Sequence, residues 1–352
     1  MSLELPTEIL SEILLNTVVL SMKEPLTTEY DMSTRPWAKD CDSLDVNKSP
    51  WTLSHVCSWW RRVSLSIPEL WTYIFIRTDH PLYDNTHRQY LLDLLLSRSK
   101  DLPLFVVIDS GARMQTNIIS LDLFLSPVIQ QSRRWKTAIL RCTLMNLYHE
   151  YPMLQRLVLS NYGFLKMPHS ASLPRLNDIA TYGLLYSDIP WHQIQRLACC
   201  CRSIRNLDSL LEKTTSLIQL RIDCQEVTVL ESVKQLSIRR LEWLADFSKM
   251  NRMTLPALEE LFLVNRAGAY SLDECIMMIK RSGCSIRKLS FQGRFQDTEV
   301  AELLSVCSRT LTEVELSGCH TPLRGIITLD TLQAHIAQFP RPQYRLEFWI
   351  ID

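Results

Sequence analysis

The chain has 352 residues, of which 46% are hydrophobic, so its composition excludes a disordered protein and leaves room for two or more domains or one elongated repeat structure. Lysine plus arginine balances aspartate plus glutamate at 38 each, which excludes a global charge that attracts nucleic acid or an anionic membrane. Eleven cysteines, an odd number without framework spacing, argue against a disulfide scaffold and favour a reducing compartment.

The N-terminal sequence and the hydropathy pattern indicate neither export nor membrane insertion. Glu4 and Glu8 precede any basic residue, unlike a signal peptide, and no apolar run approaches the roughly 20 residues that span a bilayer. We therefore expect a cytoplasmic or nuclear protein that recognises its partners through local surfaces.

Residues 3 to 19 are predicted to form the first helix. Pro6 suits a first helical turn, and the apolar residues that follow recur on one stripe. These residues are Ile9, Leu10, Ile13, Leu14 and Val18. Residues 21 to 48 lose this periodicity and are rich in proline, aspartate and hydroxyl side chains, which predicts a long surface loop. An ordinary N-terminal helix docked on the core is the alternative interpretation of the first stretch.

The stretch from Ser49 to Trp71 holds four of the nine tryptophans. Ser49 followed by Pro50 is a helix-start signal, and the helical spacing of the next apolar residues predicts an amphipathic helix. Its apolar face carries Leu53, Val56, Cys57, Trp60 and Val63. The segment is too short to bury so much aromatic surface by itself, so a larger structure must bury it.

Three pieces of this region resemble an F-box. Leu5-Pro6 with Glu8-Ile9-Leu10 matches the opening helix of that family, and Val56-Cys57 with Trp60-Arg61 matches its second helix. The closing P-x-L-W segment is matched by residues 68 to 71. All three pieces in order make a specific signal, whereas each alone is a common pattern. The departure is the insertion at 21 to 48, because the family joins its first two helices by a short loop.

The resemblance implies that this unit docks on the Skp adaptor of a cullin-RING ubiquitin ligase. The size of the unit agrees, because fewer than about 60 residues form a marginal core, yet this segment carries apolar residues on more than one helical face. The implied adaptor contacts are Leu5, Pro6, Ile9, Leu10, Ile13, Leu53, Val56, Cys57 and Trp60. The alternative is that these side chains pack on the remainder of the chain.

Residues 76 to 150 are interpreted as a bridge onto a repeat array. Helices are expected over 87–101 and 116–133, and strands over 104–108 and 135–140. From Tyr151 onward one strand signature returns, with apolar residues at i, i+3 and i+5. Its copies begin at Leu154, Leu176, Ile194, Leu217, Val233, Leu258, Ile286 and Leu311. They are 22, 18, 23, 16, 25, 28 and 25 residues apart, mostly within the period of leucine-rich repeats.

Residues 150 to 350 therefore resemble the irregular leucine-rich repeats found behind many F-box domains. Each strand and its helix expose an apolar face that only a neighbouring unit covers, so stacking is required for stability. Because side chains alternate along a strand, the polar residues beside the buried leucines are expected to line a concave sheet and to face a target protein. The residues predicted for this contact are Arg156, Arg221, Arg239, Phe262, Lys288, Glu313 and Glu315. The alternative for each of these residues is that its side chain only faces solvent and contacts no target protein.

The sequence shows no constellation for catalysis. It lacks a glycine-rich phosphate loop, a G-x-S-x-G elbow, an H-E-x-x-H helix and paired C-x-x-C motifs. The consecutive cysteines at 199 to 201 are interpreted as small buried hydrophobic residues, because adjacent strand residues point to opposite faces. We therefore expect no enzymatic activity, no cofactor and no metal.

The predicted fold is α/β, with a small all-α F-box-like unit followed by an irregular leucine-rich-repeat solenoid that has a curved parallel sheet. The predicted domains are 1–75 with its insertion at 21–48, a bridge at 76–150, and the solenoid at 151–352. The first hypothesis is a substrate-recognition subunit of an SCF-type ubiquitin ligase, which holds the adaptor at one end and a target protein at the other. The alternative is a repeat scaffold whose N-terminal helices serve only as a cap.

Overall fold

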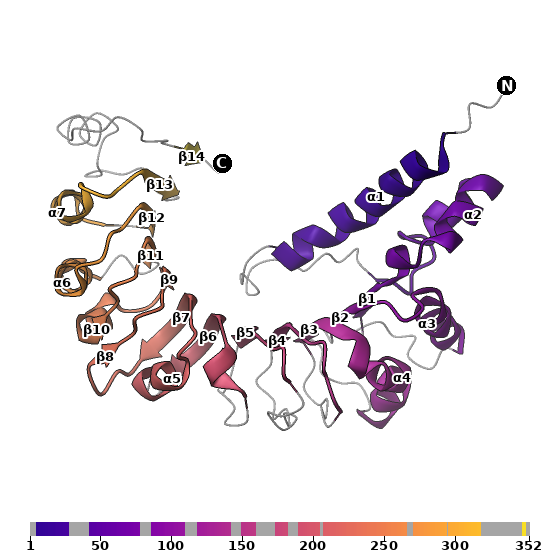
Figure 1. Cartoon of the computed structure of the whole chain (residues 1–352), viewed down its shortest axis with the longest axis horizontal. Coiled ribbons are helices and arrows are strands. Elements are labelled where there is room, and N and C mark those ends of the chain that lie inside the picture. The colour runs from indigo at the N-terminus through magenta and orange to yellow at the C-terminus, as the bar shows by residue number, and fades with distance from the viewer. Residues whose placement is uncertain are drawn as a thin grey trace. The chain divides into compact units, whose positions relative to one another are not determined.

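A computed structural model gives the structure of the chain for residues 5–27, 42–77, 86–109, 118–141, 149–159, 173–181, 189–204, 207–265, 270–293, 295–317 and 347–349. Contacts between residues divide the chain into two compact units, Met1–Pro190 and Trp191–Asp352. Each unit combines helices with parallel strands, which confirms the predicted α/β class (Figure 1). The boundaries expected near residues 75 and 150 fall inside the first unit and stay predictions.

The described residues of the first unit form five parallel strands that are hydrogen-bonded in chain order. They are β1 (Tyr73–Arg77), β2 (Leu104–Asp109), β3 (Trp135–Arg141), β4 (Arg156–Leu159) and β5 (Asp178–Thr181). The α-helices are α1 (Thr7–Thr27), α2 (Ser58–Ser66), α3 (Thr86–Arg98) and α4 (Ile118–Gln130), and the short 3-10 helices are η1 (Thr52–His55), η2 (Pro68–Trp71) and η3 (Ser132–Arg134). The helices and strands predicted between residues 87 and 140 are confirmed.

The outer edge of β1 is covered by the segment that precedes η1. The backbone N–H of Ser43 donates to the carbonyl of Phe75 at 2.8 Å, and the N–H of Phe75 donates to Ser43 Oγ at 2.9 Å. Trp51 Nε1 holds the same segment by donating to the Ser43 carbonyl at 2.7 Å, and Asp42 accepts from Arg88 on α3 at 2.9 Å. The exposed backbone groups of an edge strand are thereby paired within the unit.

The predicted surface loop at 21–48 is too long at both ends. Residues 21 to 27 continue α1, and Ser43 and Leu44 are buried against the sheet edge. Earlier in the helix, Leu10, Leu14 and Val18 form a buried row that anchors α1 on α2 and η2. Residues 28–41 of the predicted loop lie outside the described residues.

The predicted helix from Ser49 to Ser66 is broken into η1 and α2. Cys57 interrupts it in an extended conformation, and its Sγ accepts from the N–H of Trp60 at 3.5 Å as the cap of α2. The tryptophan surface is covered mainly by the unit itself. The rings of Trp51 and Trp71 are buried edge to face, with centroids 5.2 Å apart.

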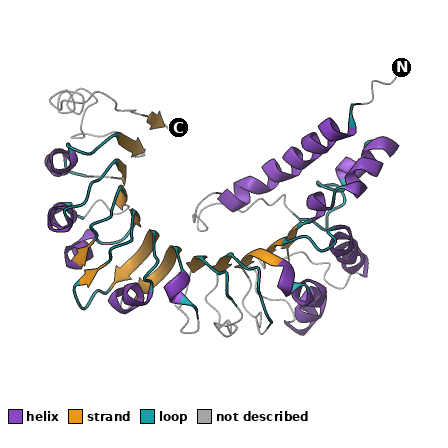
Figure 2. Ribbon diagram, in the orientation of Figure 1, coloured by secondary structure: helices purple, strands orange, loops and turns teal. Residues whose placement is uncertain are grey.

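In the second unit, the part of the chain that the structure describes forms seven parallel strands of a sheet and a separate pair. The sheet strands are β6 (Arg196–Ile204), β7 (Gln219–Val227), β9 (Arg240–Trp243), β11 (Glu260–Asn265), β12 (Lys288–Gly293), β13 (Glu313–Ser317) and β14 (Glu347–Trp349), and the pair is β8 (Val233–Lys234) with β10 (Met253–Thr254). The helices are η5 (Trp191–Gln193), α5 (Leu207–Lys213), η6 (Phe247–Arg252), α6 (Asp273–Ser282) and α7 (Asp297–Cys307). Helices α6 and α7 lie along one face of their strands (Figure 2).

The strand signature sets the register of this sheet. Leu220 pairs with Leu241, Leu241 with Leu261, and Leu261 with Leu289, so the second apolar position of each copy forms one continuous buried row. Leu289 continues the row to Val314 on β13. Each strand therefore buries its apolar face only when its neighbours are present, as a repeat structure requires.

One copy of the signature was placed wrongly. The sequence predicts a strand through Val233, Leu236 and Ile238. Val233 does lie in the short strand β8, but Leu236 is 64% exposed and the strand that joins the large sheet here is β9. The copy that pairs with its neighbours is Ile238, Leu241 and Trp243, all fully buried. Copies beginning at 217, 238 and 258 are 21 and 20 residues apart, a more regular period than the predicted 16 and 25.

Close packing of neighbouring strands explains one glycine. Gly293 at the end of β12 has a φ of +111°, and a Cβ there would lie 2.3 Å from the carbonyl oxygen of Asn265 on β11. Only glycine permits this approach of two backbones. Gly283 ends α6 in the left-handed conformation typical of a helix C-terminus.

Candidate functional site

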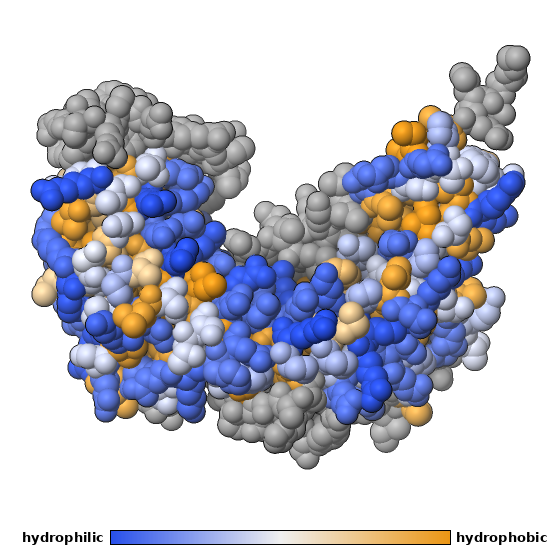
Figure 3. All heavy atoms as spheres, viewed as in Figure 1, coloured by the Kyte–Doolittle hydropathy of each residue, from blue (hydrophilic) through white to orange (hydrophobic). Residues whose placement is uncertain are grey.

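The first candidate surface is an exposed apolar row on α1. Leu10, Leu14 and Val18 are buried, yet Ile9 and Ile13, four residues apart on α1, are 50% and 42% exposed, and Leu5, just before the helix begins, is 46% exposed. Residues at this spacing lie on one face of a helix. Val56, between η1 and α2, is 60% exposed. Figure 3 shows hydrophobic side chains gathered over the α1 and α2 region.

The remaining predicted adaptor residues divide between surface and core. Pro6 and Cys57 are exposed and Trp60 is half-buried. Leu10 and Leu53 are buried and pack inside the unit instead of facing outward. The structure thus brings α1 and the start of α2 together, and it separates the predicted set into a supporting layer and an exposed layer. The role of the exposed layer as an adaptor contact stays a prediction.

The second candidate surface is the polar face of the sheet in the second unit. Its centre is Glu242 on β9, a buried carboxylate that the sequence analysis missed. Arg221 Nη1 lies 3.0 Å from Glu242 Oε2, and Arg240 Nη2 lies 2.7 Å from Glu242 Oε1. The amide of Gln219 also donates to Oε1, at 3.4 Å. Three side chains from two strands therefore satisfy one buried charge.

The ion pairs continue across the neighbouring strands. Arg240 reaches Glu260 on β11 at 3.5 Å, and Lys288 on β12 contacts Glu313 at 2.7 Å and Glu315 at 3.5 Å on β13. The ring of Phe262 lies between the two basic groups, with its centroid 4.3 Å from the Arg240 guanidinium and 5.7 Å from Lys288 Nζ. This face is therefore a ladder of alternating charges around one aromatic ring.

The charges on this face are held by their neighbours. Burial lowers the pKa of Arg221, but the carboxylate of Glu242, with Cys200 and Asp223 beside it, outweighs burial and leaves the pKa above its usual value. Burial likewise lowers the pKa of Lys288, while Glu313 and Glu315 raise it by more. Both groups stay cationic at physiological pH, and each is already paired within the chain.

The predicted target contacts fall into three places. Arg221, Phe262, Lys288, Glu313 and Glu315 share the polar face, in two adjacent rows of the strand register. Arg156 lies on β4 of the first unit, where its Nε is 3.6 Å from the buried carboxylate of Asp178. Arg239 does not lie on the sheet face, because β9 begins one residue later and the Arg239 side chain is exposed beside the strand.

Arg240 and Glu242 were missed because the strand was assigned five residues too early. The signal that could have identified them is present in the sequence, since Ile238, Leu241 and Trp243 repeat the same apolar spacing. Placing the strand there makes Arg240 and Glu242 alternate with the buried residues, as polar sheet residues do.

The structure bears on the cysteines and on metal binding within the described residues. Cys199 and Cys200 are buried free thiols, as their interpretation as small hydrophobic residues requires. Among the residues that the structure describes, no group of three or more histidine, cysteine, aspartate and glutamate side chains is arranged to hold a metal ion. Within the same ranges, no helix combines the length and apolar character needed to cross a membrane.

Comparison with protein-family models and with curated protein sequences finds no significant match.

Proposed function

We propose that the chain is the substrate-recognition subunit of an SCF-type cullin-RING ubiquitin ligase. In this proposal the first unit binds the Skp adaptor and the second unit binds a target protein. The chain catalyses nothing itself. It raises the effective concentration of the target near a ubiquitin-charged conjugating enzyme held elsewhere in the complex.

The observation that carries the proposal is the pair of apolar faces on α1. A helix that only docks on its own core needs one apolar stripe, which Leu10, Leu14 and Val18 provide. Ile9 and Ile13 form an additional row on α1, and the described residues leave this row and Leu5, just before the helix, at the surface. Exposed apolar side chains at helical spacing are typical of a helix that docks against a partner.

The arrangement of the F-box-like pieces adds support. The opening helix packs on α2 and η2, so the three matched segments come from one packed group. Buried Leu10, Leu53 and Leu70 hold that group together, while the exposed row remains accessible. An adaptor contact formed by this row buries apolar area at the centre of an interface, where binding energy concentrates.

The adaptor contact is tested with purified Skp adaptor and the full chain. Ile9→Asp combined with Val56→Asp places two charges in the proposed contact, and we expect affinity to fall by about a hundredfold or more in calorimetry. Leu123→Asp on α4 is the matched control, because Leu123 is 72% exposed in the same unit but outside the α1 row. We expect this control to bind within about twofold of the unmodified chain.

Two outcomes contradict the adaptor contact. One is absence of binding by a full chain whose circular dichroism and thermal transition show a folded protein. The other is an equal loss of affinity in the control and in the double variant.

A specific observation also favours the cap interpretation. Residues 42–51 pair with β1 through Ser43 and cover an edge that would otherwise be exposed. Repeat structures need such terminal covers whether or not a ligase partner exists. A repeat scaffold with an N-terminal cap is therefore the second candidate function.

A further inference from the structure

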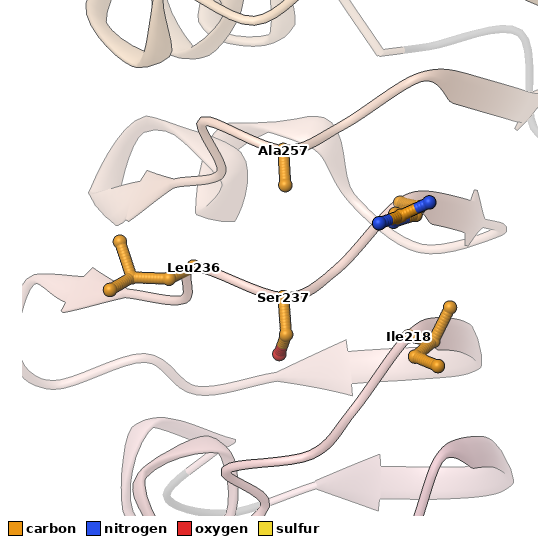
Figure 4. Close-up of a pocket in the computed structure, with 5 residues that line it drawn as sticks. Ile218, Leu236, Ser237 and Ala257 are labelled. Atoms are coloured by element: carbon orange, nitrogen blue, oxygen red, sulfur yellow. The ribbon is translucent and has the colours of Figure 1, made fainter.

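A pocket lies beside the strands of the second unit, away from the ladder of ion pairs. It has a volume of about 390 Å³ and is lined by Ile218, Leu236, Ser237, Arg239 and Ala257. The lining residues come from the segments that lead into three neighbouring strands, β7, β9 and β11 (Figure 4). Neighbouring strands lie about 4.8 Å apart, so three of them span about 10 Å, the length of about three residues of an extended chain.

The pocket wall is apolar and accessible. Leu236 is 64% exposed and Ile218 is 42% exposed, two of the exposed large hydrophobic residues of the second unit. Of the three apolar residues Val233, Leu236 and Ile238, the first and last are buried and only Leu236 is exposed. An aliphatic side chain of a partner could pack against this wall.

The frame of the pocket is rigid. The N–H of Arg239 donates to the Ile218 carbonyl at 2.8 Å, and the N–H of Glu259 donates to the Arg239 carbonyl at 2.8 Å. Buried Gln235 clamps the preceding segment, because its amide donates to the carbonyls of Leu211 and Thr214 while its backbone N–H donates to Thr254 at 3.0 Å. A preformed pocket binds with little ordering cost.

The charge beside the pocket is a single guanidinium. Arg239 is exposed, and among the described residues no carboxylate forms an ion pair with it, including its neighbour Glu259. Arg240, the next residue, instead pairs with Glu242 and Glu260 on the sheet face. Arg239 is therefore the basic group at this site that remains available to a carboxylate from outside the chain.

We propose that this pocket holds a short extended peptide of a partner protein, with one aliphatic side chain against Leu236 and Ile218 and an adjacent aspartate or glutamate paired with Arg239. The inference deepens the proposed function, because it names the chemistry of a target motif for the second unit and rests on that function for its biological role. The peptide binding itself does not require the adaptor.

The test uses a phage-displayed library of random seven-residue peptides panned against the immobilised full chain. Counter-selection uses Leu236→Asp, and a folded state of this variant is checked by circular dichroism, with Leu236→Ser as the replacement if it unfolds. We expect the enriched peptides to carry an aliphatic residue next to an aspartate or glutamate. Enrichment that persists on the counter-selection variant, or that lacks acidic residues, overturns the proposal.

A second measurement tests the contribution of the Arg239 charge separately from that of the apolar lining. For a synthetic copy of the most enriched peptide, Arg239→Glu is expected to lower affinity about tenfold or more in fluorescence anisotropy. Arg287→Glu is the matched control, since Arg287 is exposed in the same row, two strands away, and does not line the pocket. Equal losses in the two variants also overturn the proposal.

The same variants distinguish the two proposals. Adaptor affinity is measured in parallel and is expected to be unchanged by Arg239→Glu. Peptide binding without adaptor binding removes only the ligase proposal. Adaptor binding without selective peptides removes only the pocket.

Discussion

Glu242 is the residue on which the polar face of the second unit depends. Its side chain is 6% exposed and carries a charge that Arg221 and Arg240 satisfy from either side. A carboxylate in such a place is stabilising only while its partners remain, because desolvation of an unpaired charge costs several kcal/mol. Each arginine also has a second acidic neighbour, Asp223 or Glu260, so removal of Glu242 leaves both cations partly compensated.

Replacement of Glu242 by glutamine is expected to destabilise the fold. The amide keeps the shape but loses two charge-assisted contacts, and we expect the free energy of unfolding to fall by about 2 kcal/mol in urea titration at pH 7. Glu315→Gln is the control, because its pair with Lys288 is longer, at 3.5 Å, and more exposed. The control should lose less than about 0.5 kcal/mol. Similar losses in both variants would mean that the ladder is not centred on Glu242.

The buried thiol of Cys307 on α7 predicts a loss of stability in alkali. Burial, with a smaller contribution from Cys284, raises the pKa of Cys307 to about 12. An unfolded thiol loses its proton near pH 8.5. Above that pH the unfolded state releases a proton that the folded state still holds, so the free energy of unfolding falls by up to about 1.4 kcal/mol per pH unit for this thiol.

Cys307→Ala is expected to lessen this alkaline slope, measured as the urea midpoint between pH 8 and pH 10 in a reducing buffer. Leu303→Val on the same helix is the control, because Leu303 is fully buried and does not titrate. The control should lower stability at every pH by about 1 kcal/mol and keep the slope. A slope that is unchanged in Cys307→Ala would refute the assignment of the buried thiol.

Strand β9 shows how pairing with neighbouring strands decides between two overlapping apolar triplets in the sequence. Val233, Leu236 and Ile238 have the same spacing as Ile238, Leu241 and Trp243, and the two triplets share one residue. Only the second triplet places Leu241 beside Leu220 and Leu261 on the neighbouring strands. Because side chains alternate faces along a strand, the choice of triplet also decides which charged residues reach the polar face.

This register predicts opposite effects for two leucines. Leu241→Asp puts an unpaired charge into the core and is expected to abolish the cooperative thermal transition of the second unit in circular dichroism. Leu236→Asp changes an exposed residue and is expected to shift the free energy of unfolding by less than about 0.5 kcal/mol. The reverse order of effects would mean that Leu236, and not Leu241, lies in the buried row of the large sheet.

At the scale of the whole molecule, the N-terminal residues have a stabilising role that is separate from any partner. Segment 42–51 covers the edge of β1. Its Trp51 packs edge to face on Trp71, and the Arg98 guanidinium contacts both rings, 4.4 Å from the Trp71 centroid. Deletion of residues 1–75 removes this cover and most of β1, so β2 becomes an edge strand.

This deletion is expected to lower the thermal midpoint of the remaining chain by several degrees and to promote self-association, measured by calorimetry and light scattering. Ile9→Asp in the full chain is the control, because it changes an exposed residue and should leave the midpoint in place. An unchanged midpoint after the deletion would exclude the cap role. It would leave the adaptor proposal unaffected.

The α/β class, the helices at 86–98 and 118–130, and the repeated strand signature are predictable from sequence, because they depend on the local spacing of apolar residues. Tertiary structure decided which apolar residues are exposed. On α1 the rows of Leu10 and Ile9 are equally apolar in the sequence, and only packing on α2 and η2 buries the first and leaves the second at the surface. Likewise, pairing with the neighbouring strands places Leu241, and not Leu236, in the buried row of the sheet, since register depends on residues far apart in the chain.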